Sequence, residues 1–209
     1  MTLIEYLETH YITKEKLLSL STISEKELGR CQKRKLMPAA SYKLNLSVHS
    51  QSYTGQFEEC YEVEYYPRGY ASWLRTVFVF DNQEQAFALF SSQYISSIEA
   101  LKDNGHFSAA SVVADKLDVH LKEEWKHFLE GTYGLCTITG LPEEIAAKEV
   151  AIIDIESLLK LGVSNKSQLE RLRLAVSLLD KVASQFAPHE RSASSRVRYV
   201  DEVKARFKL

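Results

Sequence analysis

The segment Tyr42-Lys-Leu-Asn-Leu-Ser-Val-His49 alternates apolar and polar residues, which is the pattern of a half-buried β-strand. Its apolar residues, at positions 42, 44, 46 and 48, share one face because successive side chains of a strand point to opposite sides. A turn-rich segment follows at 50–55, and a second strand is expected from about Phe57 to Tyr66. The two strands together predict an antiparallel hairpin.

Three short helices are expected before this hairpin, within residues 3–36. The third begins at Ser24, because Ser24 and Glu27 have the spacing of a capping box, in which each side chain accepts a hydrogen bond from the other residue's main-chain N–H. Three helices followed by a two-stranded ribbon is the layout of a winged helix-turn-helix unit, with residues 25–35 in the position of the recognition helix. We assign this unit to residues 1–80.

The remainder of the chain is expected to be helical. Residues 73–80, Trp-Leu-Arg-Thr-Val-Phe-Val-Phe, are an apolar run that we interpret as a third strand, with a buried helix as the alternative. From Asp81, the expected start of a capped helix, residues 81–209 show apolar residues at helical spacing. The expected helices are 81–101, 108–130, 142–162, 168–186 and 195–207. The predicted fold class is α+β and mainly helical, with the winged-helix-like unit packed as one body on a C-terminal helical bundle.

The composition excludes several functional classes. The chain has 209 residues, of which 45% are hydrophobic, and its net charge of −2 gives no global attraction to nucleic acid. No apolar run is long enough to cross a bilayer, and three widely spaced cysteines indicate reduced thiols, so we expect a cytoplasmic protein. Neither a glycine-rich phosphate loop nor a Gly-x-Ser-x-Gly or Cys-x-x-Cys motif is present, so we expect no cofactor.

A basic cluster closes the third helix at residues 30–35 and raises the question of DNA binding. Residues 1–49 hold eight Lys and Arg against five Asp and Glu, so this part has a net charge of +3. The same helix begins with Glu25 and Glu27, however, and acidic residues at the end that reads bases count against DNA. The sequence therefore favours small-molecule partners over nucleic acid.

His120, Glu124 and His127 recur at positions i, i+4 and i+7 of one predicted helix. This spacing places the three side chains on one face, where they could bind a metal ion. A carboxylate-bridged centre would need matching ligands from other helices, and the sequence shows no such pattern. We expect a solvated helix face and no metal site.

Residues 186–199 concentrate three arginines, three serines and a histidine around a helix break at Pro188. Arginine forks suit carboxylate or phosphate, and a serine can cap the next helix, whose first N–H groups favour an anion. The segment is either an anion-binding element or a polar hinge in which Glu190 pairs with an arginine.

The ribbon and the helix before it carry a further constellation of polar residues. Arg34 ends the third helix, His49 and Ser50 end the first strand, and Glu59 begins the second strand, so the hairpin could bring His49 and Glu59 close together. Arginine can hold a carboxylate, histidine can transfer a proton, and a desolvated glutamate can act as a base. Aromatic residues are available for an apolar wall: Tyr53, Tyr61, Tyr65, Tyr66, Tyr70 and Trp73.

The order Arg34, His49-Ser50, Glu59 resembles the active-site pattern of the marinacarboline-type β-carboline synthases, bacterial enzymes of the Pictet–Spengler class. The resemblance implies that Arg34, His49 and Ser50 engage the polar groups of a substrate such as tryptophan. It implies that Glu59 removes the ring proton after the amine has condensed with an aldehyde. No metal or organic cofactor is then required.

The resemblance extends to partners and to the C-terminal part of the chain. It implies a homodimer, with amine and aldehyde substrates and with Ser192, Ser195 and Arg196 closing the pocket. Segments 131–136 and 186–199 are also similar to a broad, largely uncharacterised bacterial family of natural-product biosynthesis proteins.

Three functions follow as hypotheses. The first is an alkaloid-biosynthesis enzyme that catalyses a Pictet–Spengler condensation. The second is a winged-helix transcriptional regulator whose helical half senses a ligand or dimerises. The third is a non-catalytic accessory protein of a biosynthetic pathway.

Overall fold

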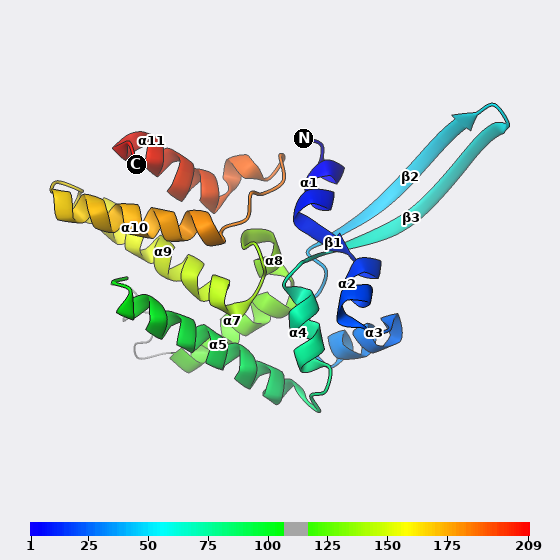
Figure 1. The fold of residues 1–209 in the computed structure, drawn as a ribbon, viewed down its shortest axis with the longest axis horizontal. Helices are drawn as coiled ribbons and strands as arrows, with labels where there is room; N and C mark the ends of the chain where they lie inside the picture. The colour runs from blue at the N-terminus through cyan, green and yellow to red at the C-terminus, as the bar shows by residue number, and fades with distance from the viewer. Residues whose placement is uncertain (107–116) are drawn as a thin grey trace.

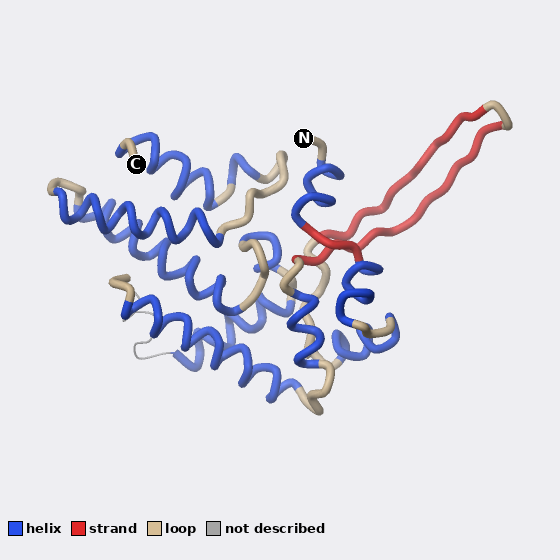
Figure 2. Tube along the Cα trace, in the orientation of Figure 1, coloured by secondary structure: helices blue, strands red, loops and turns tan. Residues whose placement is uncertain are grey.

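The structure is a computed structural model, and it describes residues 1–106 and 117–209. The protein is α+β and mainly helical, with one small antiparallel sheet (Figure 1). Figure 2 shows two strands of this sheet as a long ribbon that projects from the helical body. Among the described residues, no helix combines the length and the apolar composition needed to cross a membrane.

The N-terminal part alternates short helices and strands. Its elements are α1 (Leu3–His10), β1 (Tyr11–Thr13), α2 (Lys14–Ser21), α3 (Glu25–Lys33), β2 (Tyr42–Ser52) and β3 (Gly55–Pro67). The capping box predicted for Ser24 and Glu27 is confirmed, since both of its hydrogen bonds are present at the start of α3. The strand β1 was not predicted. It pairs with β3, so the order in the sheet is β1-β3-β2.

The predicted hairpin is confirmed as β2 and β3. Its register runs from Tyr42 opposite Tyr65 at the base to Ser52 opposite Gly55 at the turn. At the base, Tyr42 and Tyr65 pack in a small apolar cluster with residues of α1 and with Ala187. The strands continue well beyond this cluster, and every residue from 47 to 62 is exposed.

The expectation of a third strand at 73–80 is wrong, because this segment forms most of the helix α4 (Tyr70–Val77). Tyr70, Trp73, Leu74 and Val77 recur at helical spacing and are all buried, whereas Ser72, Arg75 and Thr76 are exposed. The run is rich in aromatic and β-branched residues, which favour strands locally. Burial of one helical face in the core outweighs that local preference.

The C-terminal part is a helical bundle. Its elements are α5 (Gln83–Asp103), α7 (Leu117–Leu129), α8 (Thr132–Cys136), α9 (Pro142–Leu161), α10 (Lys166–Val182), the helical turns η1 (Arg191–Ala193) and η2 (Val197–Asp201), and α11 (Glu202–Phe207). In this bundle α9 packs against both α5 and α10 (Figure 1). The predicted helix over 108–130 is confirmed only from residue 117, because residues 107–116 lie outside the described residues.

Two predicted helix ends differ from those in the structure. The side chain that caps α5 is Asn82, not Asp81, and it accepts a hydrogen bond from the main-chain N–H of Gln85. The helix α10 ends at Val182, before the predicted residue 186, because Ala183 is extended and forms a β-bridge with Thr137. A tertiary contact therefore ends this helix earlier than Pro188 would require.

One hydrophobic cluster joins the two parts of the chain. It contains Leu17 and Leu28 from the N-terminal helices and Phe90, Phe128 and Val150 from α5, α7 and α9. A second cluster lies between α9, α10 and α11. The N-terminal helices therefore share their core with the first helices of the bundle.

Candidate functional site

The structure does not bring together the two residues predicted to be catalytic, His49 and Glu59. Along the ribbon, His49 lies opposite Glu58 and Val48 lies opposite Glu59. Because cross-strand partners share a face and neighbouring positions alternate, His49 and Glu59 point to opposite faces. His49 instead lies beside the exposed carboxylate of Glu58, with Nδ1 3.1 Å from Oε1.

The other two residues of that constellation lie apart from any shared chamber. Ser50 is exposed and faces Phe57 near the turn of the ribbon. At a rise of about 3.3 Å per residue, Ser50 is roughly 26 Å along β2 from Tyr42 at the base. Arg34 caps the end of α3, and its Nη2 donates to the main-chain oxygen of Asp81. The prediction that a carboxylate, a histidine and an arginine share one pocket at the ribbon is therefore corrected.

At the C-terminal corner, Arg196 is buried and holds the end of α10. Its Nη1 donates to the main-chain oxygens of Asp180 and Ala183, at 3.3 and 3.2 Å, and its Nη2 pairs with the Asp180 carboxylate. These bonds satisfy carbonyl groups that a helix end leaves without partners. Ser192 is exposed, and Ser195 is half-buried. This geometry favours the polar hinge over an anion-binding element for this corner.

The partner predicted for Glu190 also differs from the one in the structure. Its carboxylate accepts a hydrogen bond of 2.6 Å from the hydroxyl of Tyr42, not from an arginine. Arg191 instead pairs with Asp201, at 3.0 Å, and donates to the main-chain oxygen of Gln185. The segment therefore links the base of the ribbon to the last helices.

Replacing Asp180 with asparagine is expected to destabilise the protein by about 1–3 kcal/mol at pH 7, because the buried Arg196 loses its charged partner. The pKa of the Asp180 carboxyl is held below its usual 3.8 by Lys204, which donates to it at 2.5 Å, and by Arg196. Since the folded pKa is depressed, this contribution is complete above about pH 5 and is lost as the pH falls below 3.8. Urea unfolding at pH 7 and at pH 3 measures both effects.

The matched control is Asp201→Asn, which breaks the more exposed pair with Arg191. Such pairs contribute little, so the control should change the free energy of unfolding by less than about 1 kcal/mol at either pH. Equal losses in Asp180→Asn and the control, or a loss in Asp180→Asn that is as large at pH 3 as at pH 7, would contradict this account.

The exposed side of α3 presents basic side chains. Glu25 is neutralised by Lys14, at 2.7 Å, and Glu27 is engaged with Ser24 in the capping box. Lys26, Arg30 and Lys33 follow at positions i, i+4 and i+7, are exposed, and form no ion pair within residues 1–106 and 117–209. Together with Ser24, Glu27, Gly29 and Arg34 they line a surface depression of about 760 Å³. We call Lys26, Arg30 and Lys33 the basic face of α3.

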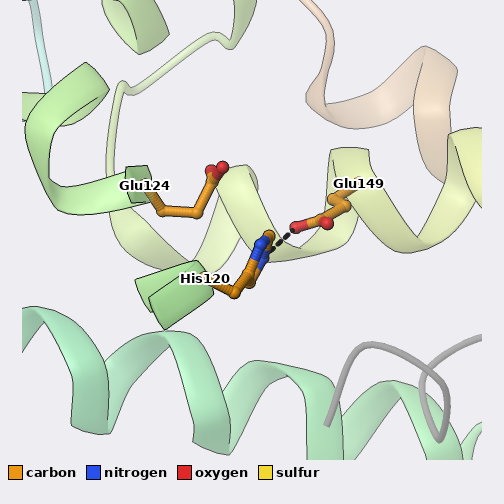
Figure 3. Close-up of side chains that lie close together, drawn as sticks. All are labelled: His120, Glu124 and Glu149. Atoms are coloured by element: carbon orange, nitrogen blue, oxygen red, sulfur yellow. Dashed lines mark hydrogen bonds and ion pairs between the residues drawn. The ribbon is translucent and has the colours of Figure 1, made fainter. Parts of the chain in front are cut away.

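A polar cluster lies between α7 and α9. It consists of His120 and Glu124, one turn apart on α7, and Glu149 on α9 (Figure 3). His120 Nε2 lies 3.0 Å from Oε2 of Glu149, and one ligand atom from each of the three residues lies within 4.8 Å of the others. We call these three residues the His120 cluster.

Two tyrosine hydroxyls hold the carboxylates of the His120 cluster. Tyr94 of α5 donates to Glu149, and its oxygen lies 3.1 Å from Nε2 of His120. Tyr133 of α8 donates to Glu124. Burial raises the pKa of Glu124, and the negative charge of Glu149 adds to that rise, whereas the hydrogen bond from Tyr133 opposes it. The cluster is therefore half-buried and held in place by its neighbours.

The sequence pattern identified only two members of this cluster. Spacing along one helix placed His120 and Glu124 on a common face, as the structure shows. His127, which has the same spacing, is exposed and pairs with Glu130, with Nδ1 3.4 Å from Oε2. Glu149 comes from another helix, and no local signal in the sequence marks it as a partner of His120.

An apolar groove of about 820 Å³ runs between the segment before β2 and the helices α5 and α7. Met37, Phe87, Trp125 and Leu129 provide apolar lining. Its charged lining is mostly basic, with Lys35, Lys43, Lys122 and Lys126 against Glu84 and Glu130. The groove therefore suits a ligand with an apolar body and an anionic end.

Comparison with known proteins places the helical part in a family. No match to the chain was found among curated proteins, and none among solved structures. The model of a family of unknown function, DUF6058, matches residues 86–208, which is more than half of the chain. The match includes the His120 cluster and leaves out α1 to α4 and the ribbon. The chain therefore belongs to the DUF6058 family.

Proposed function

We propose that the protein is a winged-helix regulator that binds duplex DNA through α3. The observation that carries the proposal is the basic face of α3, which is exposed and forms no ion pair in the described part of the chain. The element order α1-β1-α2-α3-β2-β3 and the sheet order β1-β3-β2 support it, because a winged helix-turn-helix unit has this order and places its third helix against DNA. Of the two acidic residues at the start of α3, which counted against DNA, Glu25 pairs with Lys14, whereas Glu27 keeps its negative charge and is engaged in the capping box.

The ribbon has another role in this proposal. Its outer part carries Glu58, Glu59 and Glu62, so it would be repelled by phosphates. The face on which Val48, Phe57 and Tyr61 lie is exposed, and it carries Ser50 and Glu59 beside these three residues. We propose that this face meets a second copy of the chain, because two copies present two α3 helices to two half-sites. Sedimentation of the chain at increasing concentration reports the dimer.

The test of DNA binding is the salt dependence of binding. The full chain is titrated into a fluorescently labelled duplex of about 20 base pairs, and anisotropy is read between 50 and 200 mM salt. If the three residues of the basic face each neutralise one phosphate, the logarithm of the association constant should fall with a slope of about −2.7 against the logarithm of salt concentration. Absence of binding at 50 mM salt, or binding that does not depend on salt, would reject the proposal.

Alkaloid biosynthesis is the second proposal, and the apolar groove is what supports it. Phe87 and Trp125 offer aromatic walls to the flat ring of an aryl-ethylamine, and Lys122 or Lys126 can pair with a substrate carboxylate. The ribbon residues His49 and Glu59 lie on opposite faces and give this proposal no support. Incubation with tryptophan and an aldehyde, followed by β-carboline fluorescence, tests it. Absence of product with any aryl-ethylamine would reject it.

A further inference from the structure

We propose that the His120 cluster is a binding site for a divalent first-row transition metal ion, with His120, Glu124 and Glu149 as its protein ligands. The site is independent of DNA binding by α3, because its three residues lie on α7 and α9 within the part that the family match covers. An imidazole nitrogen and two carboxylate oxygens suit Mn²⁺, Fe²⁺ or Zn²⁺ better than an all-oxygen ion such as Ca²⁺.

The geometry of the cluster is close to that of a bound site. Metal bonds to nitrogen and oxygen are about 2.1 Å long, so two ligand atoms on one ion are at most about 4.2 Å apart. The three donor atoms here lie within 4.8 Å of one another, and His120 Nε2 is 3.0 Å from the Glu149 oxygen. A side-chain movement of about 1 Å therefore brings all three into the coordination distance. Figure 3 shows the carboxylate of Glu149 pointing toward the ring of His120, with the side chain of Glu124 beside them on α7.

The surroundings of the cluster resemble the outer shell of a metal site. Each carboxylate accepts a hydrogen bond from a tyrosine, Tyr94 for Glu149 and Tyr133 for Glu124. Bonds of this kind orient ligands and leave the remaining oxygen lone pairs for an ion. Without a metal ion, these hydrogen bonds would still satisfy the two tyrosine hydroxyls. Two carboxylates would then remain close together in a half-buried position.

The charges of the cluster favour a metal site over a hydrogen-bond network that holds no ion. Two carboxylates lie beside one histidine, and within residues 1–106 and 117–209 no lysine or arginine forms an ion pair with Glu124 or Glu149. A divalent cation would balance the charges of both carboxylates in their ionised form. Three protein ligands also leave coordination positions for water, which is typical of catalytic rather than structural metal centres.

The experiment measures metal binding by the full chain after removal of metal with EDTA. Titration calorimetry with Mn²⁺ and with Zn²⁺ is expected to show one site. At a concentration of about 100 times the dissociation constant, the ion should raise the Tm by about 5 °C or more. Glu124→Gln, Glu149→Gln and His120→Ala should each weaken binding by at least about 10-fold. The glutamine variants keep an oxygen that accepts the tyrosine hydrogen bond, so they are expected to fold.

Two control variants match these changes. Glu156→Gln alters another carboxylate of α9 that accepts a hydrogen bond from a tyrosine, Tyr199. His127→Ala removes the exposed histidine of α7. Both should bind metal as the unchanged chain does. The proposal is overturned if neither ion binds, if Glu149→Gln binds with unchanged affinity, or if His127→Ala abolishes binding.

Discussion

Alanine substitution of both Arg30 and Lys33 is expected to weaken binding to duplex DNA by about 100-fold at moderate salt. Each side chain is exposed on α3, and a charge-assisted hydrogen bond to phosphate contributes about 1.5–3 kcal/mol, or at least 10-fold in affinity. The slope of binding against salt should also fall by about 2, because two fewer counterions are released. Fluorescence anisotropy with one labelled duplex measures both quantities.

The control removes the same charge from elsewhere on the surface. Lys102 lies in the last turn of α5 and Lys166 begins α10, and both are exposed. Lys102→Ala/Lys166→Ala changes the net charge equally, so it should lower the affinity by a few-fold at most through the overall field. If the control weakens binding as much as Arg30→Ala/Lys33→Ala does, the attraction comes from net charge and not from the basic face of α3.

Phe128→Ala is expected to reduce the free energy of unfolding by about 3–5 kcal/mol. Phe128 is fully buried, and its ring lies 4.9 Å from that of Trp73, 5.1 Å from that of Phe90 and 5.4 Å from that of Trp125. Because Trp73 belongs to α4 and the other two belong to α5 and α7, this contact joins the N-terminal helices to the bundle. Urea unfolding followed by circular dichroism should show one shifted transition for the whole chain.

The control for this substitution is Leu161→Ala, at an exposed position at the end of α9. Exposed changes of this kind usually alter stability by less than about 0.5 kcal/mol. Two separate transitions in Phe128→Ala, with only one of them shifted, would contradict a shared core.

Local patterns predicted most of the secondary structure. The capping box at Ser24 placed the start of α3, and the alternation at 42–48 placed β2, because both patterns reflect interactions between residues close in sequence. The prediction of a strand at residues 73–80, which contribute to α4, was wrong because the local pattern there is ambiguous. These residues fit a strand and a buried helix equally well, and packing against the core decided between them.

In the candidate sites too, local patterns predicted some of the residue neighbours, and packing decided the others. Spacing on α7 predicted that His120 and Glu124 share a face, but Glu149 is 25 positions further along the chain than Glu124 and joins them only through the packing of helices. The ribbon residues show the converse. His49 and Glu59 are close in the hairpin, yet a register that pairs His49 with Glu58 places them on opposite faces.

The amino-acid sequence alone determined the fold class, the ribbon, most helix positions and the basic residues of α3, because periodicity, capping and charge depend on near neighbours. The strand register, the neutralisation of Glu25 by Lys14 and the meeting of His120 with Glu149 were decided only by the tertiary structure. These contacts depend on how the elements pack, and the packing energy is summed over many residues that are distant in sequence.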